Sequence, residues 1–107
     1  MINAKKEFIV HTKGHDIKCA SVNWDDSGAA LLPVGYTTSQ LFKFLKSLDF
    51  EYDEGYGAQY LFGTIWYDDR TWSERAEYDG KERWRHLKQP LITTALYYRS
   101  SVKGKKP

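Results

Sequence analysis

Residues 61–84 read LFGTIWYDDRTWSERAEYDGKERW, the densest run of aromatic and charged side chains in the chain. Within and beside this run, residues 60–69 place apolar side chains at both odd and even positions, which predicts a central strand buried on both faces. Residues 68–70 have turn chemistry, and residues 71–78 then alternate apolar and polar side chains. We therefore expect a β-hairpin with a tryptophan on each side of its turn.

The segment after this hairpin contains a possible helix start. Asp79 and Glu82 have the spacing of a capping box, and apolar residues follow at helical spacing until Pro90. A short helix over 80–88 is therefore preferred to a fifth strand. Residues 91–101 are rich in β-prone side chains and are a candidate edge strand.

The clearest helical signal lies before the hairpin, over about 38–48. Thr37 or Thr38 is a good N-cap. The apolar residues that follow have helical spacing and occupy one half of the helix surface; they are Leu41, Phe42, Phe44, Leu45 and Leu48. We expect this helix to cover one face of a sheet.

The N-terminal part predicts another hairpin. Residues 5–25 contain an apolar centre at 8–10, turn chemistry around His15 and a second β-prone run over 17–24. Residues 25–36 contain glycine and proline, which indicates a connection with a short extended piece at 30–32.

The remaining inner segment, 49–59, is predicted to be a loop that begins in an extended conformation. At 107 residues the chain has room for one domain, 1–107. We predict an α+β fold with an antiparallel sheet made from two β-hairpins, the amphipathic helix at about 38–48 packed on it and a short helix after residue 79. Residues 102–107 are expected to be a frayed basic tail.

The net charge of +2 is too small to indicate a nucleic-acid or membrane partner by itself. The charge is unevenly distributed, however, because residues 49–69 carry six acidic and no basic side chains, whereas residues 70–107 carry ten basic and four acidic ones. Such polarity either orients a partner or pairs the two segments within the fold. No apolar window approaches the length of a membrane span, and the N-terminus lacks a signal-peptide pattern, so we expect a cytoplasmic protein without membrane association.

Metal and cofactor motifs are incomplete. The acidic run Asp49, Glu51, Asp53 begins like a calcium loop, but Glu54 stands where that loop needs glycine and Tyr60 where it needs a bidentate glutamate. The Glu-Gly-Tyr-Gly sequence at 54–57 lacks the strand-to-helix setting of a phosphate loop. We therefore expect neither a metal nor a cofactor.

Catalytic constellations are also incomplete. Cys19 is the single cysteine, which excludes an intramolecular disulfide and a multi-cysteine zinc site. His11 and His15 lie near it in the predicted hairpin, but a nucleophile would also need an orienting group and an oxyanion hole. His86 adds one more titratable group. A small hydrolase that uses a histidine is the weakest alternative, and we expect that the protein is not an enzyme.

Aromatic and charged side chains between 66 and 84 form the candidate interaction site. Tryptophan, tyrosine and arginine dominate the energetics of protein interfaces. The residues assigned to the site are Trp66, Asp69, Arg70, Trp72, Arg75, Glu77, Tyr78, Asp79 and Trp84. The same segment interleaves aromatic and basic residues, so nucleic-acid binding through the basic C-terminal half is the alternative.

The same segment carries a family resemblance. It matches a pattern in which a Trp-x-x-Asp-Gly-Thr-Trp turn leads to Arg-x-Glu-Tyr-Asp-Gly-Ser-Glu-x-Trp, through Trp66, Asp69, Thr71, Trp72, Arg75, Glu77, Tyr78, Asp79, Gly80, Glu82 and Trp84. Over 48–90 the chain resembles small uncharacterised proteins encoded by bacterial prophages and plasmids. Arg70 replaces the turn glycine of that pattern and Lys81 its serine, which opens the alternative of a longer loop in place of a tight primed turn.

The resemblance implies an accessory protein of a mobile element. Common modes of such proteins are to bind and inhibit a host or defence protein. We therefore expect a non-catalytic protein-interaction module of phage or mobile-element origin, an inhibitor or modulator of a host or defence protein, that acts in the cytoplasm of the host cell. The sequence leaves homo-oligomerisation open.

Overall fold

The computed structural model describes residues 1–25, 28–55 and 57–96. It confirms the α+β class, with a five-stranded antiparallel sheet, a two-stranded sheet and two helices among these residues. The elements in chain order are β1 (Ile2–Asn3), α1 (Ala4–Thr12), β2 (Ile17–Trp24), β3 (Gly28–Leu32), α2 (Thr38–Ser47), β4 (Glu51–Tyr52), β5 (Leu61–Tyr67), β6 (Trp72–Tyr78) and β7 (Lys81–Leu87).

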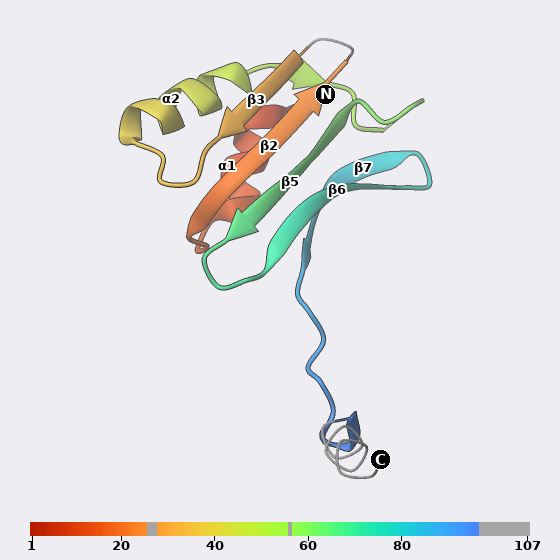
Figure 1. Cartoon of the computed structure of the whole chain (residues 1–107). Helices are drawn as coiled ribbons and strands as arrows, with labels where there is room; N and C mark the ends of the chain where they lie inside the picture. The colour runs from red at the N-terminus through yellow and green to blue at the C-terminus, as the bar shows by residue number, and fades with distance from the viewer. Residues whose placement is uncertain (26–27, 56, 97–107) are drawn as a thin grey trace.

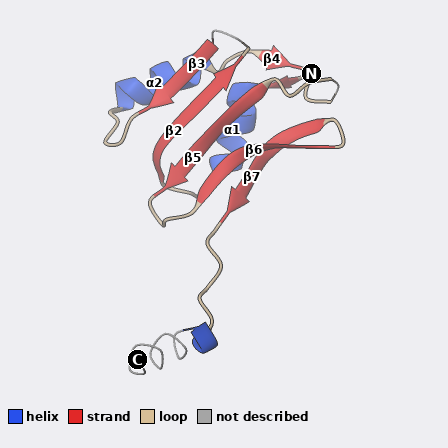
Figure 2. Ribbon diagram, turned by 45° about the vertical axis from the view of Figure 1, so that its right-hand side comes forward, coloured by secondary structure: helices blue, strands red, loops and turns tan. Residues whose placement is uncertain are grey.

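The five-stranded sheet has the order β3-β2-β5-β6-β7, and all its neighbours are antiparallel. Helix α1 lies across one face of this sheet, and α2 lies beside β3 at one edge (Figures 1 and 2). Strands β1 and β4 pair next to the start of α1. The core fills the space between α1 and the sheet, where Phe8 of α1 contacts Phe44 of α2 and Trp84 of β7.

The predicted hairpin over 5–25 is wrong in its first arm. Residues 4–12 form α1, whose N-cap Asn3 accepts a hydrogen bond from the backbone N–H of Lys6. The side chains that this helix buries are Ala4, Phe8 and Thr12, four residues apart, as one helical face requires. The apolar run at 8–10 misled the prediction because the two residues after Phe8 are exposed in the helix.

The second arm and the central helix are confirmed. Residues 17–24 form β2, which pairs with β3, and β3 contains the extended piece expected at 30–32. Helix α2 begins after Thr37, whose side chain and that of Gln40 form a complete capping box. Phe44 and Leu48 are buried on its inner side, whereas Phe42 is 70% exposed.

The β5–β6 hairpin is confirmed, and Trp66 pairs with Trp72 across it. Its loop has three residues, 68–70, and the backbone N–H of Tyr67 donates to the carbonyl of Thr71. Arg70 adopts φ 71°, the left-handed conformation that such three-residue loops usually give to glycine. The replacement of the turn glycine by arginine thus leaves a three-residue loop with a strained residue in its last position.

Relief of this strain gives a first prediction. Arg70→Gly should raise the free energy of unfolding by about 1 kcal/mol, because glycine adopts positive φ without a Cβ clash. Urea denaturation measures the change. Arg70→Ala is the matched control, because it removes the guanidinium but keeps the Cβ, and it should leave the stability unchanged. A gain with alanine as large as with glycine would attribute the effect to charge instead of backbone strain.

The helix expected over 80–88 is wrong, because residues 81–87 form strand β7. Asp79 and Gly80 have φ of 54° and 82°, the pair of positive values that a two-residue type I′ turn requires. The capping-box spacing of Asp79 and Glu82 therefore belongs to a hairpin. Residues 91–93 have no regular structure and 94–96 form one helical turn, so this part of the expected edge strand is absent. Residues 97–101, and the tail expected at 102–107, lie outside the described residues.

Strand β5 is central, as predicted, but it is not buried on both faces. Leu61, Ile65 and Tyr67 face α1 and are buried, whereas Phe62 and Trp66 point to the opposite side and are 45% and 44% exposed. Neither helix covers that side in the described part of the chain (Figures 1 and 2). The described part of the chain therefore leaves one face of the five-stranded sheet uncovered.

Candidate interaction site

The uncovered side of the sheet, opposite α1, is here called the outer face. Because side chains alternate along a strand, the cross-strand register assigns each residue to one face. Large apolar side chains lie on it at Leu31 of β3, which is 71% exposed, and at the half-exposed Phe62 and Trp66 of β5, with β2 between these two strands. We define the apolar band as Leu31, Phe62, Trp66 and Trp72. Apolar side chains gathered on an uncovered sheet face are typical of a contact surface.

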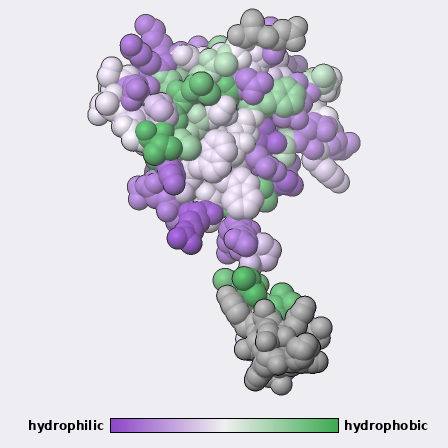
Figure 3. All heavy atoms as spheres, in the orientation of Figure 1, coloured by the Kyte–Doolittle hydropathy of each residue, from purple (hydrophilic) through white to green (hydrophobic). Residues whose placement is uncertain are grey.

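A row of cations borders this band on edge strand β7. Lys81, Arg83 and Arg85 all face outward, since they pair with Tyr78, Ala76 and Glu74 of the neighbouring strand. Arg85 forms an exposed ion pair of 3.2 Å with Glu74. Lys81 and Arg83 form no ion pair within the part of the chain that the structure describes. Figure 3 shows the outer face of the sheet, on which hydrophobic and near-neutral residues lie beside hydrophilic ones.

The opposite, inner face holds a buried polar network around Arg75. Its guanidinium donates from Nη1 to Glu7 at 3.0 Å and from Nη2 to both Tyr52 and Glu82 at 2.8 Å. The side chains of Arg75 and Glu82 are 1% and 3% exposed. The carboxylate of Glu82 also accepts the backbone N–H groups of Tyr60 and Leu61. Because the pairing of β5 with β6 ends at Thr64, Glu82 supplies acceptors that a neighbouring strand would otherwise provide.

Burial and neighbouring charges shift the pKa values of Arg75 and Tyr52 in this network. Burial opposes the charge of Arg75, but the carboxylates of Glu7 and Glu82 outweigh it, so the pKa of the guanidinium is raised. Burial and the hydrogen bond that it donates to Glu7 raise the pKa of Tyr52, which therefore stays protonated. Two carboxylates share one guanidinium, and the network bridges α1, β4, β6 and β7. Its role is structural, because both terminal nitrogens of the guanidinium bond groups of the network; among the described residues only its buried Nε has no hydrogen-bond partner.

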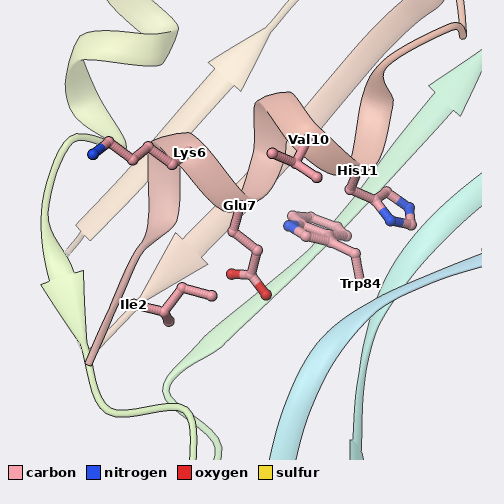
Figure 4. A pocket seen from close by; sticks show the side chains of 6 residues that line it. All are labelled: Ile2, Lys6, Glu7, Val10, His11 and Trp84. Carbon is pink, nitrogen blue, oxygen red and sulfur yellow. The ribbon is translucent and has the colours of Figure 1, made fainter.

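A pocket of about 370 Å³ lies between α1 and the β7 side of the sheet. Figure 4 shows Trp84 projecting from the sheet toward α1 beneath the side chains of Val10 and His11. The guanidinium of Arg75 lies 5.2 Å from the Trp84 ring centroid, and the His11 ring is stacked on the indole. Ile2, Lys6 and Glu7 complete the lining. Among the residues that the structure describes, the buried indole N–H of Trp84 has no hydrogen-bond partner.

Three histidines gather at the far end of α1. His11 Nε2 lies 2.7 Å from Ser73 Oγ, which also bonds the Tyr67 hydroxyl, and the His15 ring packs against those of Tyr67 and His86. Burial lowers the pKa of His11 and raises that of Tyr67. Ser73 is fully buried, so the contact between His11 and Ser73 offers no surface to a substrate. Cys19 instead pairs with Trp66 on the outer face, apart from this cluster.

The structure divides the predicted interaction residues between several locations. Trp66, Trp72 and Tyr78 share the outer face, where Tyr78 is 75% exposed. Arg75 and Trp84 are buried on the inner face, where Trp84 lines the pocket beneath α1. The others lie at the hairpin ends: Asp69 and Arg70 in one loop, and Glu77 and Asp79 at the opposite one. The nine residues are therefore not one surface.

Sequence reasoning missed several members of the two faces. Leu31 and Phe62 belong to the apolar band, but their exposure depends on the absence of a covering layer, which no local pattern indicates. Glu7 and Tyr52 belong to the Arg75 network from elements 20 or more residues away in sequence. The sequence did contain a signal for strand β7. Glu82 and Trp84 alternate with basic residues, and this alternation has the two-residue period of a strand.

The other expectations concern metals, membranes and charge pairing. Within residues 1–25, 28–55 and 57–96, no group of three or more histidine, cysteine or acidic residues could hold a metal ion. Among the same residues, no helix has the length and apolar character needed to cross a membrane. No ion pair of the described chain joins the acidic block 49–69 to the basic block that follows.

The chain has no match in any of three comparisons. No protein-family model, no curated protein and no solved structure is significantly similar to it.

Proposed function

We propose that this protein is a non-catalytic protein-interaction module that binds its partner through the outer face of the sheet. The observation that carries the proposal is the apolar band, whose members Leu31, Phe62 and Trp66 are between 44% and 71% exposed on one uncovered sheet face. Antiparallel sheets usually expose polar side chains on their solvated side. Apolar and aromatic side chains that stay exposed contribute little to the stability of the protein alone. They would contribute more to the stability of a complex in which a partner buries them.

The chemistry of the face defines the partner. The band offers apolar contact, and the unpaired cations Lys81 and Arg83 at its border favour an acidic rim on the partner. An apolar centre with a charged border is the usual composition of a protein interface. The resemblance to prophage and plasmid proteins supports a host or defence protein as that partner, which this chain would inhibit or modulate.

Capture from a bacterial lysate tests the proposal. Trp66→Ser should weaken binding of the captured partner by about 2 kcal/mol, roughly thirtyfold in Kd, because an exposed indole at the centre of an interface is a typical hot spot. Isothermal titration with the purified partner measures the change. Phe42→Ser is the matched control, since Phe42 is 70% exposed on α2, away from the outer face. Equal binding by Trp66→Ser and the wild type would contradict the proposal.

A second candidate function is binding of single-stranded nucleic acid. The observation that favours it is the spacing of Lys81, Arg83 and Arg85 at every second residue beside exposed aromatic rings, a composition suited to phosphate contacts and base stacking. A fluorescent single-stranded oligonucleotide should then bind with an affinity that falls steeply with salt, and Arg83→Gln should reduce the salt slope by about one. Lack of binding at low salt would exclude this candidate.

A further inference from the structure

Strand β7 is an edge of the sheet, and no further strand of the described chain pairs with its outer hydrogen-bonding groups. In a hairpin closed by a two-residue turn, Tyr78 and Lys81 exchange both backbone hydrogen bonds, and every second pair after them does the same. The backbone groups of residues 82, 84 and 86 therefore point away from β6. The N–H of Glu82 donates to the carbonyl of Glu54 at 3.0 Å, in agreement with this direction. The N–H and C=O groups of Trp84 and His86 face the open edge.

The two sides of this edge differ in chemistry. Arg83 and Arg85 lie on the outer side. Trp84, which is between them in sequence, lies on the inner side. The pocket of about 370 Å³ lies beside Trp84 under helix α1 (Figure 4). Its apolar lining includes Ile2 and Val10. A strand placed next to β7 would therefore meet cations on one face and an apolar cavity on the other.

We propose that β7 binds an extended segment of a partner protein as a sixth strand. The segment carries an aliphatic residue flanked on both sides by Asp or Glu. Its backbone bonds Trp84 and His86, its acidic side chains lie opposite Arg83 and Arg85, and the aliphatic side chain between them enters the pocket. Backbone pairing supplies affinity in such strand addition, and alternate side chains supply specificity. This site is separate from the apolar band and does not rest on the function proposed for it.

Charge and shape argue for this occupant over others. The chain's own exposed apolar segment, 91–96, reads LITTAL and contains no acidic residue to meet the cations. A nucleic acid would satisfy the cations but would present no aliphatic side chain to the pocket.

A short synthetic peptide tests the proposal with the full chain. The probe is a fluorescein-labelled peptide of alternating glutamate and valine, and the control probe has the same composition in an order that groups the glutamates. Fluorescence anisotropy should show saturable binding of the alternating peptide and binding at least about tenfold weaker for the grouped one. Equal binding of the two peptides would show charge attraction alone and would overturn strand addition.

Substitutions at His86 isolate the backbone contribution. His86→Pro removes an N–H that points to the open edge and no bond of the β6–β7 pair, so edge proline is compatible with the fold. It should weaken the alternating peptide about tenfold, whereas His86→Ala should bind like the wild type, because it loses the same side chain and keeps the N–H. Circular dichroism verifies that both variants are folded. Equal affinity of the two folded variants would overturn the proposal.

Two further variants separate this site from the outer face. Arg83→Glu should weaken peptide binding about tenfold or more through like-charge repulsion. Trp66→Ser should leave it unchanged, since Trp66 lies two strands away from β7. Loss of peptide binding in Trp66→Ser would place the peptide on the apolar band and would overturn the assignment to the β7 edge. Failure of this peptide to bind would not contradict the function proposed for the outer face, which the Trp66→Ser measurement with the captured partner tests separately.

Discussion

Arg75→Met is expected to lower the free energy of unfolding by about 4 kcal/mol, the cost of removing one partner from a buried ion pair. The guanidinium of Arg75 is the one cation in contact with both Glu7 and Glu82 among the described residues. Methionine fills similar space but leaves the Glu82 carboxylate, which is 3% exposed, without a counter-charge. The hydrogen bond to Tyr52 is lost as well.

Unfolding in guanidinium chloride, followed by circular dichroism, measures this loss of unfolding free energy. Arg85→Met is the matched control, because its ion pair with Glu74 joins side chains that are 49% and 40% exposed. Exposed pairs contribute little, so the control should cost about 0.5 kcal/mol or less. Adding Glu82→Gln to Arg75→Met should recover part of the loss, because a carboxamide needs no counter-charge. A loss below about 1 kcal/mol in the single variant would contradict the role assigned to the network.

Gly63→Ala is expected to destabilise the protein by about 3 kcal/mol, since overpacking against a rigid neighbour adds to backbone strain. Gly63 has φ 154° and pairs with Val22 of the adjacent strand. A Cβ at this position would lie 2.4 Å from the carbonyl oxygen of Ser21 and 2.9 Å from the Cα of Val22. Both are backbone atoms of β2, so relief would require the central strands of the sheet to separate.

Gly14→Ala separates the two contributions. Gly14 also has positive φ, 85°, but nothing lies within 4 Å of its Cβ position. It should therefore cost only the backbone strain of a left-handed residue, about 1 kcal/mol. Thermal unfolding of both variants at one pH gives the comparison. Equal losses for Gly63→Ala and Gly14→Ala would show that the clash with β2 is relieved at no cost.

Helix α1 shows why local patterns were insufficient at the N-terminus. Phe8 and the two apolar residues after it favour a strand by composition. The helix forms because a face made of Ala4, Phe8 and Thr12 packs on the sheet, with Phe8 1% exposed. The signals present in the sequence were the N-cap Asn3 and the polar residues after Ala4, and they are weak beside the burial of one phenylalanine.

Strand β7 shows an ambiguity between two valid local rules. Asp79 followed by Gly80 is a strong signal for a type I′ turn, but Asp79 and Glu82 also have the spacing of a capping box. Tertiary contacts decide between them. Glu82 in a strand reaches Arg75 and the backbone of Leu61, contacts that a helix over 80–88 would not place together.

The candidate site was predicted in part. The sequence placed Trp66 and Trp72 on two sides of one turn, and their common face follows from strand alternation. It assigned Arg75 and Trp84 to the same patch, although they lie on the buried face. The prediction failed because aromatic and arginine side chains serve interfaces and buried networks equally well, and composition does not distinguish the two uses.

By itself the sequence determined the α+β class, helix α2 with its N-cap at Thr37 or Thr38, strand β2 and the β5–β6 turn. These features depend on neighbours a few residues apart, so their physical causes are visible in a local window. Only the tertiary structure decided that α1 is a helix, that β7 is an edge strand and that one sheet face is left uncovered. Each of these depends on which distant groups meet, as Arg75 meets Glu7 across 68 positions of the chain.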